Sequence, residues 1–273
     1  LGSSSAGNCA VFEAGNTRIL LDAGLSGKQI RERLAELRIG IETIQAVIIT
    51  HEHSDHILGL RGLASEAHLE FFANASTIEA VRRTLGKDLR WRIFETGSTF
   101  RIGDLEVSTF ATPHDASEPV GLIIQAQVDT QLRCLGWLTD LGHVPVRLAD
   151  KMRAVQCLVI ESNYDEDLLE QDTKRSFSLK QRIRGRHGHL SNEDTHHYLE
   201  STADASWEHV FFVHLSPGCN CPTLVQQRAQ ALHQSGKTFS MEVIKPKGGI
   251  QGWFELSSSR KIPQGVQCEW SFN

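Results

Sequence analysis

The chain alternates between short apolar runs and longer segments in which apolar residues recur every three or four positions. The short runs are rich in β-branched residues, which is typical of buried strands. They predict strands at Cys9–Glu13, Arg18–Asp22, Ala46–Thr50, Leu69–Ala73, Leu105–Thr112, Val120–Val128, Leu132–Asp140, Val155–Glu161, His209–Leu215, Thr238–Val243 and Ile250–Glu255. The periodic segments predict helices at Ser26–Leu37, Asn74–Leu85, Asn192–Ser201 and Pro222–His233.

This interleaving of strands and helices predicts an α/β (α+β) protein in which two sheets pack together and helices cover their outer faces. With 273 residues, of which 40% are hydrophobic, the chain can bury one large core. We therefore expect one domain over residues 1–256. Residues 257–273 have mixed polarity and no period, so we expect them to form a C-terminal extension.

Composition favours a soluble cytoplasmic enzyme without a membrane span. No apolar stretch approaches the length that crosses a bilayer, and the first residues lack the pattern of a secretory signal. The six cysteines are scattered, and we interpret them as reduced thiols. Cys219 and Cys221 stay open as metal ligands, although two cysteines separated by one residue are a weak signal.

The strongest chemical signal is the segment Thr50–His56, which reads Thr-His-Glu-His-Ser-Asp-His directly after a β-branched apolar run. The cluster therefore stands where a strand ends and a turn or helix begins. There His51 and His53 can face one ion, while Asp55 and His56 can reach a second. Imidazole and carboxylate suit Zn²⁺, Mn²⁺ or Fe. The alternative is a polar loop that happens to be rich in histidine.

Four more polar residues follow apolar strands elsewhere in the chain. They are Asp22, His114, Asp140 and His214. Taken singly, such an aspartate is usually a helix cap or turn residue, and such a histidine is usually hydrogen-bonded in place. Taken with the cluster, they supply enough carboxylates and imidazoles for two cations that share a bridging carboxylate.

A second constellation concerns the substrate. The segment Lys174–Arg186 holds six basic side chains and no acidic one, although the whole chain has a net charge of −5. The predicted helix that starts near Ser191 and Asn192 offers free N–H groups that favour an anion. A nucleic-acid backbone can lie across this strip; the alternative is a solvated helix face. The predicted contacts are Lys180, Arg182, Arg184, Arg186, Ser191 and Asn192.

Two further histidines belong to this picture. His189 is our candidate for the group that stabilises the scissile phosphate or protonates the leaving oxygen, and the alternative is a structural imidazole that caps a loop. His143, three residues after Asp140, is expected to border the pocket.

The segment His51–His56, with Asp22 before it and His114, Asp140 and His214 after it in that order, resembles the ligand set of the metallo-β-lactamase fold superfamily. Further motifs resemble the YycJ/WalJ (VicX) group, which is related to the RNase Z, RNase J and β-CASP nucleases. These motifs are Ser3–Cys9, Thr112–Ala116, Glu161–Asp167, Gly188–Asn192 and His214–Ser216. Two departures stand out. The chain begins where the first strand of the family should be ending, so we expect a missing N-terminal stub, and residues 217–222 replace an Asn-rich turn.

The resemblance implies a four-layer αββα sandwich of two mixed β-sheets and a hydrolase with two divalent ions, Zn²⁺ or Mn²⁺ with Fe possible. It implies that His51, His53 and His114 hold one ion, that Asp55, His56 and His214 hold the other, and that Asp140 bridges them. Asp22 would orient the ligand imidazoles. Asp55 would also orient the attacking water or take its proton, so Asp55 and His189 are the predicted catalytic residues.

Three classes of function stay open at this point. The leading one is a phosphodiesterase or nuclease, including a 5′–3′ exonuclease, that acts on DNA or RNA through a hydroxide whose formation the two ions favour. The second is hydrolysis of a thioester, lactone or β-lactam, which the absence of an export signal and of an appended helical domain disfavours. An iron-based oxidoreductase is disfavoured because such relatives usually carry a carboxylate at the position of His53. The third, a non-catalytic metal-binding protein, is disfavoured by the intact ligand set.

Overall fold

The computed structural model describes residues 1–4, 7–86, 88–246, 251–252 and 254–256. Two β-sheets form its centre. The first sheet has the order β1-β2-β3-β4-β5 and the second the order β12-β11-β10-β9-β8-β7-β6. In the first sheet β1 and β2 are antiparallel and the other neighbours parallel; in the second, β9 to β12 run parallel and β6 to β9 antiparallel. Both sheets are therefore mixed, as predicted.

The strands of the first sheet are β1 (Ala10–Ala14), β2 (Thr17–Leu21), β3 (Ala46–Ile48), β4 (Glu70–Ala73) and β5 (Trp91–Ile93). Those of the second sheet are β6 (Thr99–Ile102), β7 (Leu105–Ala111), β8 (Val120–Val128), β9 (Gln131–Leu138), β10 (Cys157–Glu161), β11 (His209–Val213) and β12 (Ser240–Val243). The helices are α1 (Gly27–Glu36), α2 (Ser54–Ile57), α3 (Leu60–Leu63), α4 (Ala75–Leu85), α5 (Val146–Arg153), α6 (Glu166–Gln171), α7 (Phe177–Arg184), α8 (Asn192–Ser201) and α9 (Pro222–Gln234), with a 3₁₀ turn at Ile41–Thr43.

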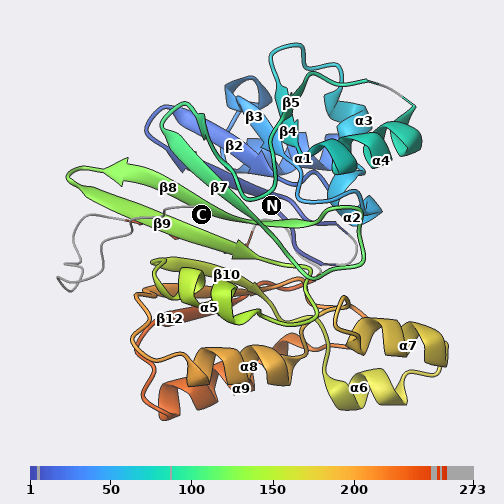
Figure 1. Ribbon diagram of the computed structural model, residues 1–273, viewed down its shortest axis with the longest axis vertical. Helices are drawn as coiled ribbons and strands as arrows, with labels where there is room; N and C mark the ends of the chain where they lie inside the picture. The colour runs from blue at the N-terminus through green and yellow to red at the C-terminus, as the bar shows by residue number, and fades with distance from the viewer. Residues whose placement is uncertain (5–6, 87, 247–250, 253, 257–273) are drawn as a thin grey trace.

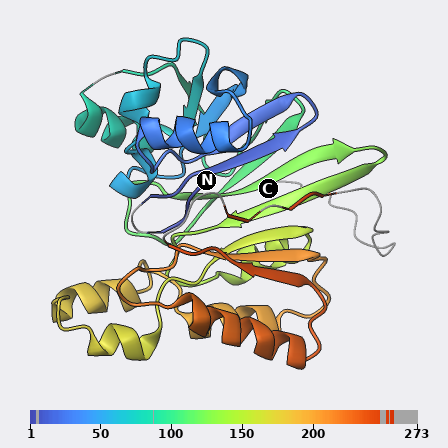
Figure 2. The ribbon, with the colours of Figure 1, turned by 180° about the vertical axis from the view of Figure 1, so that it is seen from behind.

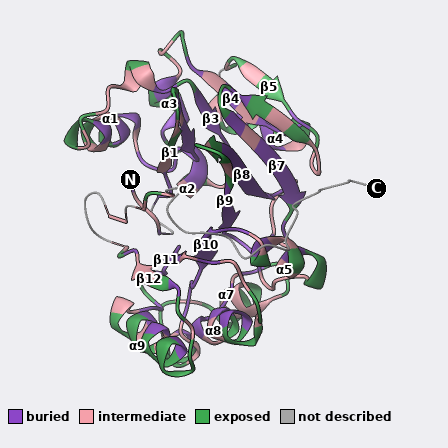
Figure 3. Ribbon diagram, turned by 90° about the vertical axis from the view of Figure 1, so that its left-hand side faces the viewer, coloured by how far each residue is buried: buried purple, intermediate pink, exposed green. Residues whose placement is uncertain are grey.

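Successive side chains along a strand face opposite sides of the sheet, and this alternation separates the core between the sheets from the cores beneath the helices. In β2, Ile19 and Leu21 face the core between the two sheets, whereas Leu20 faces the core beneath α1 and α3. A third core packs the outer face of the second sheet against α5, α8 and α9. Figures 1 and 2 show the two helical layers on opposite sides of the paired sheets, and Figure 3 shows the strands buried between them. The predicted four-layer αββα sandwich is confirmed.

Local signals explain where the longer helices begin and end. Ser26 caps α1 in a reciprocal pair with Gln29, and Asn74 caps α4 by accepting from the N–H of Thr77. Gly86 follows α4 at φ 62°, the left-handed conformation that glycine adopts without strain and that ends a helix. All four helices predicted from periodicity are present to within a residue or two at each end.

The C-terminal part of the chain departs from the predictions or lies beyond them. A strand was predicted at Ile250–Glu255, but the residues of this range that the structure describes form no strand. The predicted extension 257–273 lies outside the described residues. Among the residues that the structure describes, no helix is long and apolar enough to cross a membrane.

Candidate metal centre

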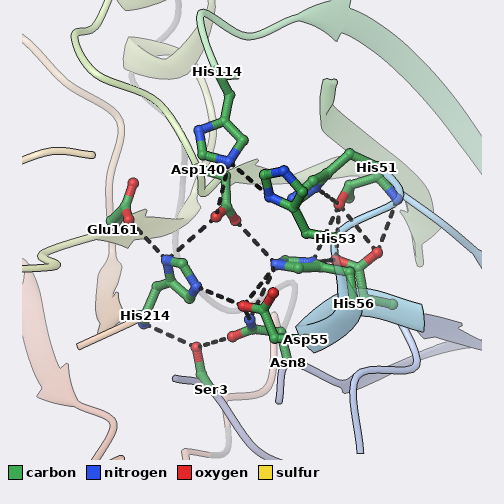
Figure 4. Close-up of polar contacts among 12 residues, drawn as sticks. Ser3, Asn8, His51, His53, Asp55, His56, His114, Asp140, Glu161 and His214 are labelled. Atoms are coloured by element: carbon green, nitrogen blue, oxygen red, sulfur yellow. Dashed lines mark hydrogen bonds and ion pairs between the residues drawn. The ribbon is translucent and has the colours of Figure 1, made fainter. Parts of the chain in front are cut away.

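The seven predicted metal ligands meet at one edge of the sandwich, where strands of both sheets end. They fall into overlapping groups whose ligand atoms lie within 4.8 Å of one another. These groups are His51, His53 and His114; His51, His56 and Asp140; and Asp55, His56 and His214. A fourth group joins Asp140 and His214 to Glu161 and His189. Figure 4 shows the imidazoles and carboxylates directed toward one another from different elements.

His51 and His56 are oriented from the side of the first sheet. The Nδ1–H of His56 donates to Asp22 Oδ2 (2.8 Å), and Nδ1 of His51 lies 3.0 Å from Thr50 Oγ. Thr50 in turn donates both its backbone N–H and its hydroxyl to Asp22. With Nδ1 directed at an oxygen, each ring presents Nε2 to the centre, which is how histidine ligands are usually fixed.

His114 and His53 form the side of the centre that faces α7. His114 Nδ1 lies 3.1 Å from the carbonyl oxygen of Gly188 and donates to it, so its Nε2 faces inward, 3.8 Å from Asp140 Oδ1. His53 Nδ1 lies 3.3 Å from His114 Nε2. His53 is also the more exposed of the two, with 31% of its side chain accessible, so the centre opens to solvent on this side.

Glu161 organises the opposite side. Its Oε1 accepts from Nδ1 of His189 (2.7 Å) and from Nδ1 of His214 (2.8 Å), while Oε2 accepts from the backbone N–H of Leu141. Burial alone would raise the pKa of this fully buried carboxyl, but the two imidazoles lower it well below the usual range. Burial lowers the pKa of His189, but the Glu161 carboxylate raises it, and the net change is upward.

Asp55 is fixed by the N-terminal loop. The side-chain amide of Asn8 donates to Asp55 Oδ2 (3.2 Å), and its backbone N–H donates to the Asp55 carbonyl (2.8 Å). Ser3 completes the link, because its hydroxyl donates to Asn8 Oδ1 and accepts from the N–H of His214. Burial raises the pKa of Asp55, but hydrogen bonds from His214 and His56 outweigh this effect and lower it. The carboxyl is therefore ionised at neutral pH.

Three of the site residues stand in the left-handed backbone conformation. Asp22, Asp140 and His214 have φ of 58°, 57° and 58°, and each directly or nearly follows a strand. This conformation is unfavourable for residues with a β-carbon and persists where the surroundings enforce it, which is characteristic of functional sites. It turns each side chain toward the centre at the point where the strand stops.

The donor set fits a metal ion. Within the described part of the chain, two buried atoms of the cluster lack a hydrogen-bond partner, His51 Nε2 and Asp140 Oδ2. Burial lowers the pKa of His51 well below its usual value, so the ring is neutral and Nε2 carries a free lone pair. A buried acceptor without a donor costs about 1–3 kcal/mol, a penalty that coordination of a cation removes.

A pocket of about 230 Å³ adjoins the centre. His53 and His189 line it from the centre, and Leu179, Arg182 and Ile183 line it from α7. Arg182 pairs with Asp115 at the rim. His189 and His53 are thus both accessible from this pocket.

The other predicted substrate contacts lie as follows. Lys180 donates to the carbonyl of Glu170, and Arg184 pairs with Glu166 and Glu170, so both face α6. Arg186 is exposed. Ser191 caps α8, Asn192 exchanges hydrogen bonds with Asn220, and both are 1% exposed. The structure thus gathers the metal ligands tightly, whereas the basic strip is spread over more than one face. His143 lies beside Arg186, whose carbonyl it contacts.

Several residues of the site were not singled out from the sequence. Glu161 ends a predicted apolar strand, so the rule that found Asp22 and Asp140 applies to it equally. Asn8 and Ser3 act through contacts 47 and 211 residues apart in the chain, for which no local pattern exists. Arg175, which also lines the pocket, is one of six similar basic residues in the strip.

The chain was compared with known proteins. A family model described as β-lactamase superfamily domain matches residues 17–215. The chain is 37% identical to exodeoxyribonuclease WalJ of Streptococcus pneumoniae over 255 residues, covering 90% of this chain and 93% of the relative. It is 32% identical to exodeoxyribonuclease YycJ of Bacillus anthracis over 272 residues, covering 98% and 97%. The crystal structure of the metallo-β-lactamase fold protein YhfI from Bacillus subtilis superposes with a TM-score of 0.65 at 17% identity, covering 89% and 93%. This structural likeness concerns the fold.

Proposed function

The chain belongs to the β-lactamase superfamily, in its metallo-β-lactamase fold, and from that premise we propose that it is a metal-dependent nuclease that degrades DNA. The observation that carries the proposal is the buried cluster of imidazoles and carboxylates, in which His51 Nε2 has no hydrogen-bond partner and Asp140 Oδ2 has only an ion-pair contact with His56. Two relatives that match nearly the whole chain are named exodeoxyribonucleases, which supports DNA as the substrate.

We assign two divalent ions, Zn²⁺ or Mn²⁺ with Fe possible, to the centre. His51, His53 and His114 would hold one ion, Asp55, His56 and His214 the other, and Asp140 would bridge them. The grouping of these residues within ligand distance of one another supports the assignment. Asp22 would act by holding Nδ1 of His56, which turns Nε2 toward the carboxylates of Asp55 and Asp140.

When bound, such ions supply Lewis acidity toward a phosphodiester oxygen and lower the pKa of a water near them. Asp55 would orient the attacking water or take its proton. Its Oδ2 is fixed by Asn8, and it stays ionised because His56 and His214 lower its pKa. The ionised carboxylate can accept a hydrogen bond from that water and so orient it.

His189 would protonate the leaving oxygen. Its Nδ1 is hydrogen-bonded to Glu161, and the ring lines the pocket with 22% of its side chain exposed, so Nε2 is left to meet a substrate. The buried Glu161 carboxylate raises the pKa of the imidazole and so favours the proton-donating form. Removal of a positioned acid typically slows a reaction by about 10²–10⁴-fold.

The rim of the pocket offers positive charge to a polyanion. Arg182 lines the pocket and is 60% exposed, so its pairing with Asp115 is open to exchange for a phosphate. Contacts of Lys180, Arg184, Arg186, Ser191 and Asn192 with nucleic acid stay predictions.

The test is hydrolysis of end-labelled single- and double-stranded DNA and RNA, with and without Mn²⁺, Zn²⁺ and a chelator. A thioester and a β-lactam serve as competing substrates. We expect chelator-sensitive cleavage of DNA that His51→Ala abolishes together with bound metal. The matched control is His197→Ala, which removes an exposed imidazole on α8. Chelator-resistant cleavage, or turnover of the thioester or β-lactam without cleavage of any nucleic acid, would contradict the proposal.

A further inference from the structure

His53 differs from the other predicted ligand histidines in how its ring is held. In four of them the ring nitrogen that faces away from the centre lies 2.8–3.1 Å from a protein oxygen; these four are His51, His56, His114 and His214. His53 turns Nδ1 inward, 3.3 Å from His114 Nε2, so its outward atom is Nε2 (Figure 4). Within the described residues this Nε2 makes no hydrogen bond, and Asp115 Oδ1 lies 4.0 Å from it, which is too far for one.

Asp115 is bound on its other side by an arginine. Its Oδ2 accepts from Nε of Arg182 on α7, while its Oδ1 lies 3.6 Å from His114 Nε2. The carboxylate thus lies between two ligand histidines and a guanidinium, and the guanidinium makes the close contact. Asp115 has 27% of its side chain exposed, so the carboxylate is free to turn toward His53.

The loop that carries Asp115 is fixed from both sides. Glu52, directly before His53, accepts the backbone N–H and the hydroxyl of Ser117 at 2.8 and 2.7 Å. The backbone N–H of Gly142 donates to the carbonyl of Pro113 at 3.0 Å. A change of partner at Asp115 therefore requires a rotation of its side chain and no movement of the loop.

The helix that carries Arg182 is also held independently of Asp115. On the same helix, Lys180 donates to the carbonyl of Glu170, and Arg184 pairs with Glu166 and Glu170 of α6. The carbonyl of Ile183 accepts the N–H of His189 at 2.9 Å. Arg182 can therefore exchange its partner while α7 stays in place.

His53 and Arg182 compete for the same carboxylate. The outward N–H of a ligand histidine usually donates to a carboxylate or carbonyl, which fixes the ring and makes its inward nitrogen a better ligand. In the observed arrangement Asp115 contacts Arg182 and does not reach His53. All three side chains line the pocket of about 230 Å³, so an anionic group of a substrate can reach Arg182 there.

We propose that Asp115 is a positioning residue for His53 that is shared with Arg182, so that an anion on Arg182 releases Asp115 to His53 and strengthens binding of the metal ion. The inference rests on the proposed function, because it couples the ion and the anionic substrate assigned there. Coupling of this kind is reciprocal, so a loaded centre binds the phosphate backbone of DNA more tightly than an empty one.

The test measures the affinity of the metal-free protein for Zn²⁺ and for Mn²⁺ by competition with a chelator, in the absence of DNA. Arg182→Gln should raise the affinity roughly two- to fivefold, which corresponds to about 0.4–1 kcal/mol, the typical contribution of an exposed ion pair. Asp115→Asn keeps the shape of the side chain without its charge and should lower the affinity by roughly 10-fold. A purely structural role of Asp115 does not explain a gain of affinity in Arg182→Gln.

Two further variants serve as controls. Arg184→Gln is the matched control, because Arg184 belongs to the same helix but pairs with α6, and it should leave the affinity unchanged. Asp115→Asn combined with Arg182→Gln separates the coupling from direct repulsion between Arg182 and the ion. This double variant should bind the ion as weakly as Asp115→Asn alone.

The outcomes distinguish this inference from the proposed function. If Arg182→Gln raises the affinity equally with and without Asp115, or does not raise it at all, the inference is overturned and the metal-dependent nuclease stands. A parental protein that binds neither ion contradicts both. If the parent binds the ion but cleaves no DNA, the nuclease proposal fails, and the four variants still decide whether Asp115 is shared between His53 and Arg182.

Discussion

Replacing Glu161 with glutamine tests whether this residue holds the metal centre together. The carboxylate of Glu161 accepts three hydrogen bonds in a fully buried position, from His189, His214 and the backbone N–H of Leu141. Glutamine has the same shape but only one accepting oxygen. If this oxygen faces the imidazoles, the amide NH₂ meets the N–H of Leu141; if it faces Leu141, the NH₂ meets two ring N–H groups. Either orientation leaves a buried donor without an acceptor.

The magnitude follows from this mismatch. One unsatisfied buried donor costs about 1–3 kcal/mol of folding free energy. Loss of the group that orients a ligand histidine typically lowers metal affinity or activity by about 10- to 100-fold. The pKa of His189 should also fall, because Glu161 is the group that raises it. A general acid acts only when protonated, so the alkaline limb of the rate profile should move to lower pH.

Three measurements separate these effects: urea unfolding of the metal-free protein, metal content after dialysis against a weak chelator, and the pH dependence of DNA cleavage. The control is Glu208→Gln, which neutralises a carboxylate that pairs with the buried Arg133 near the start of β11, in the same sheet. That variant should lose stability but keep its metal and its pH profile. If Glu161→Gln retains parental metal affinity and an unshifted alkaline limb, the role assigned to Glu161 is refuted.

Three other predictions follow from the same geometry. Asn8→Asp places a second carboxylate against Asp55 and should reduce DNA cleavage more than Asn8→Ala; equal activities of the two variants would show that the contact does not matter. Replacing both Arg182 and Arg186 with alanine should lower the slope of log affinity against log salt by about 1.8 on duplex DNA, and an unchanged slope would mean that neither contacts phosphate. Burial lowers the pKa of His209 from 6.5 to about 4, so its stabilising effect is present above pH 6.5 and is lost as the pH falls toward 4. Urea unfolding should show that the parent loses about 2 kcal/mol more unfolding free energy between pH 7.5 and pH 5 than His209→Gln does. Equal losses in the two proteins would contradict this prediction.

The parts of the fold that the sequence predicted well are those with a strong apolar period. Strand β8 matches its predicted range of Val120–Val128, and α8 matches Asn192–Ser201. Most of the elements that were not predicted are short or exposed; α5 is the exception, since it buries Leu148 and Met152. Strand β5 spans three residues with two of them exposed, and no residue of α7 is buried. Such elements bury too little apolar surface to leave a pattern in the sequence, and they form because their neighbours hold them in place.

The predicted metal ligands could be brought together from the sequence because each one follows an apolar strand, and the ends of neighbouring strands meet at one edge. Glu161 obeys the same rule but was not assigned a role. Asn8 and Arg175 follow no such rule. Asn8 reaches Asp55 only after the N-terminal loop folds over the centre, and Arg175 differs from its basic neighbours only in the carboxylate of Asp172 behind it.

Oxygen atoms of the protein orient the histidines of the centre, and the source of that orientation explains the strained backbone around them. The oxygens that accept their Nδ1–H groups come from separate elements: Asp22 after β2, the Gly188 carbonyl beyond α7, and Glu161 at the end of β10. No single loop could hold them all, so both sheets must end at the same place and the chain must turn sharply there. The positive φ angles of Asp22, Asp140 and His214 are those turns. The local cost is of order 1–3 kcal/mol for each residue and is offset by the buried core between the sheets. The candidate metal site is therefore a property of the whole sandwich rather than of the His51–His56 segment alone.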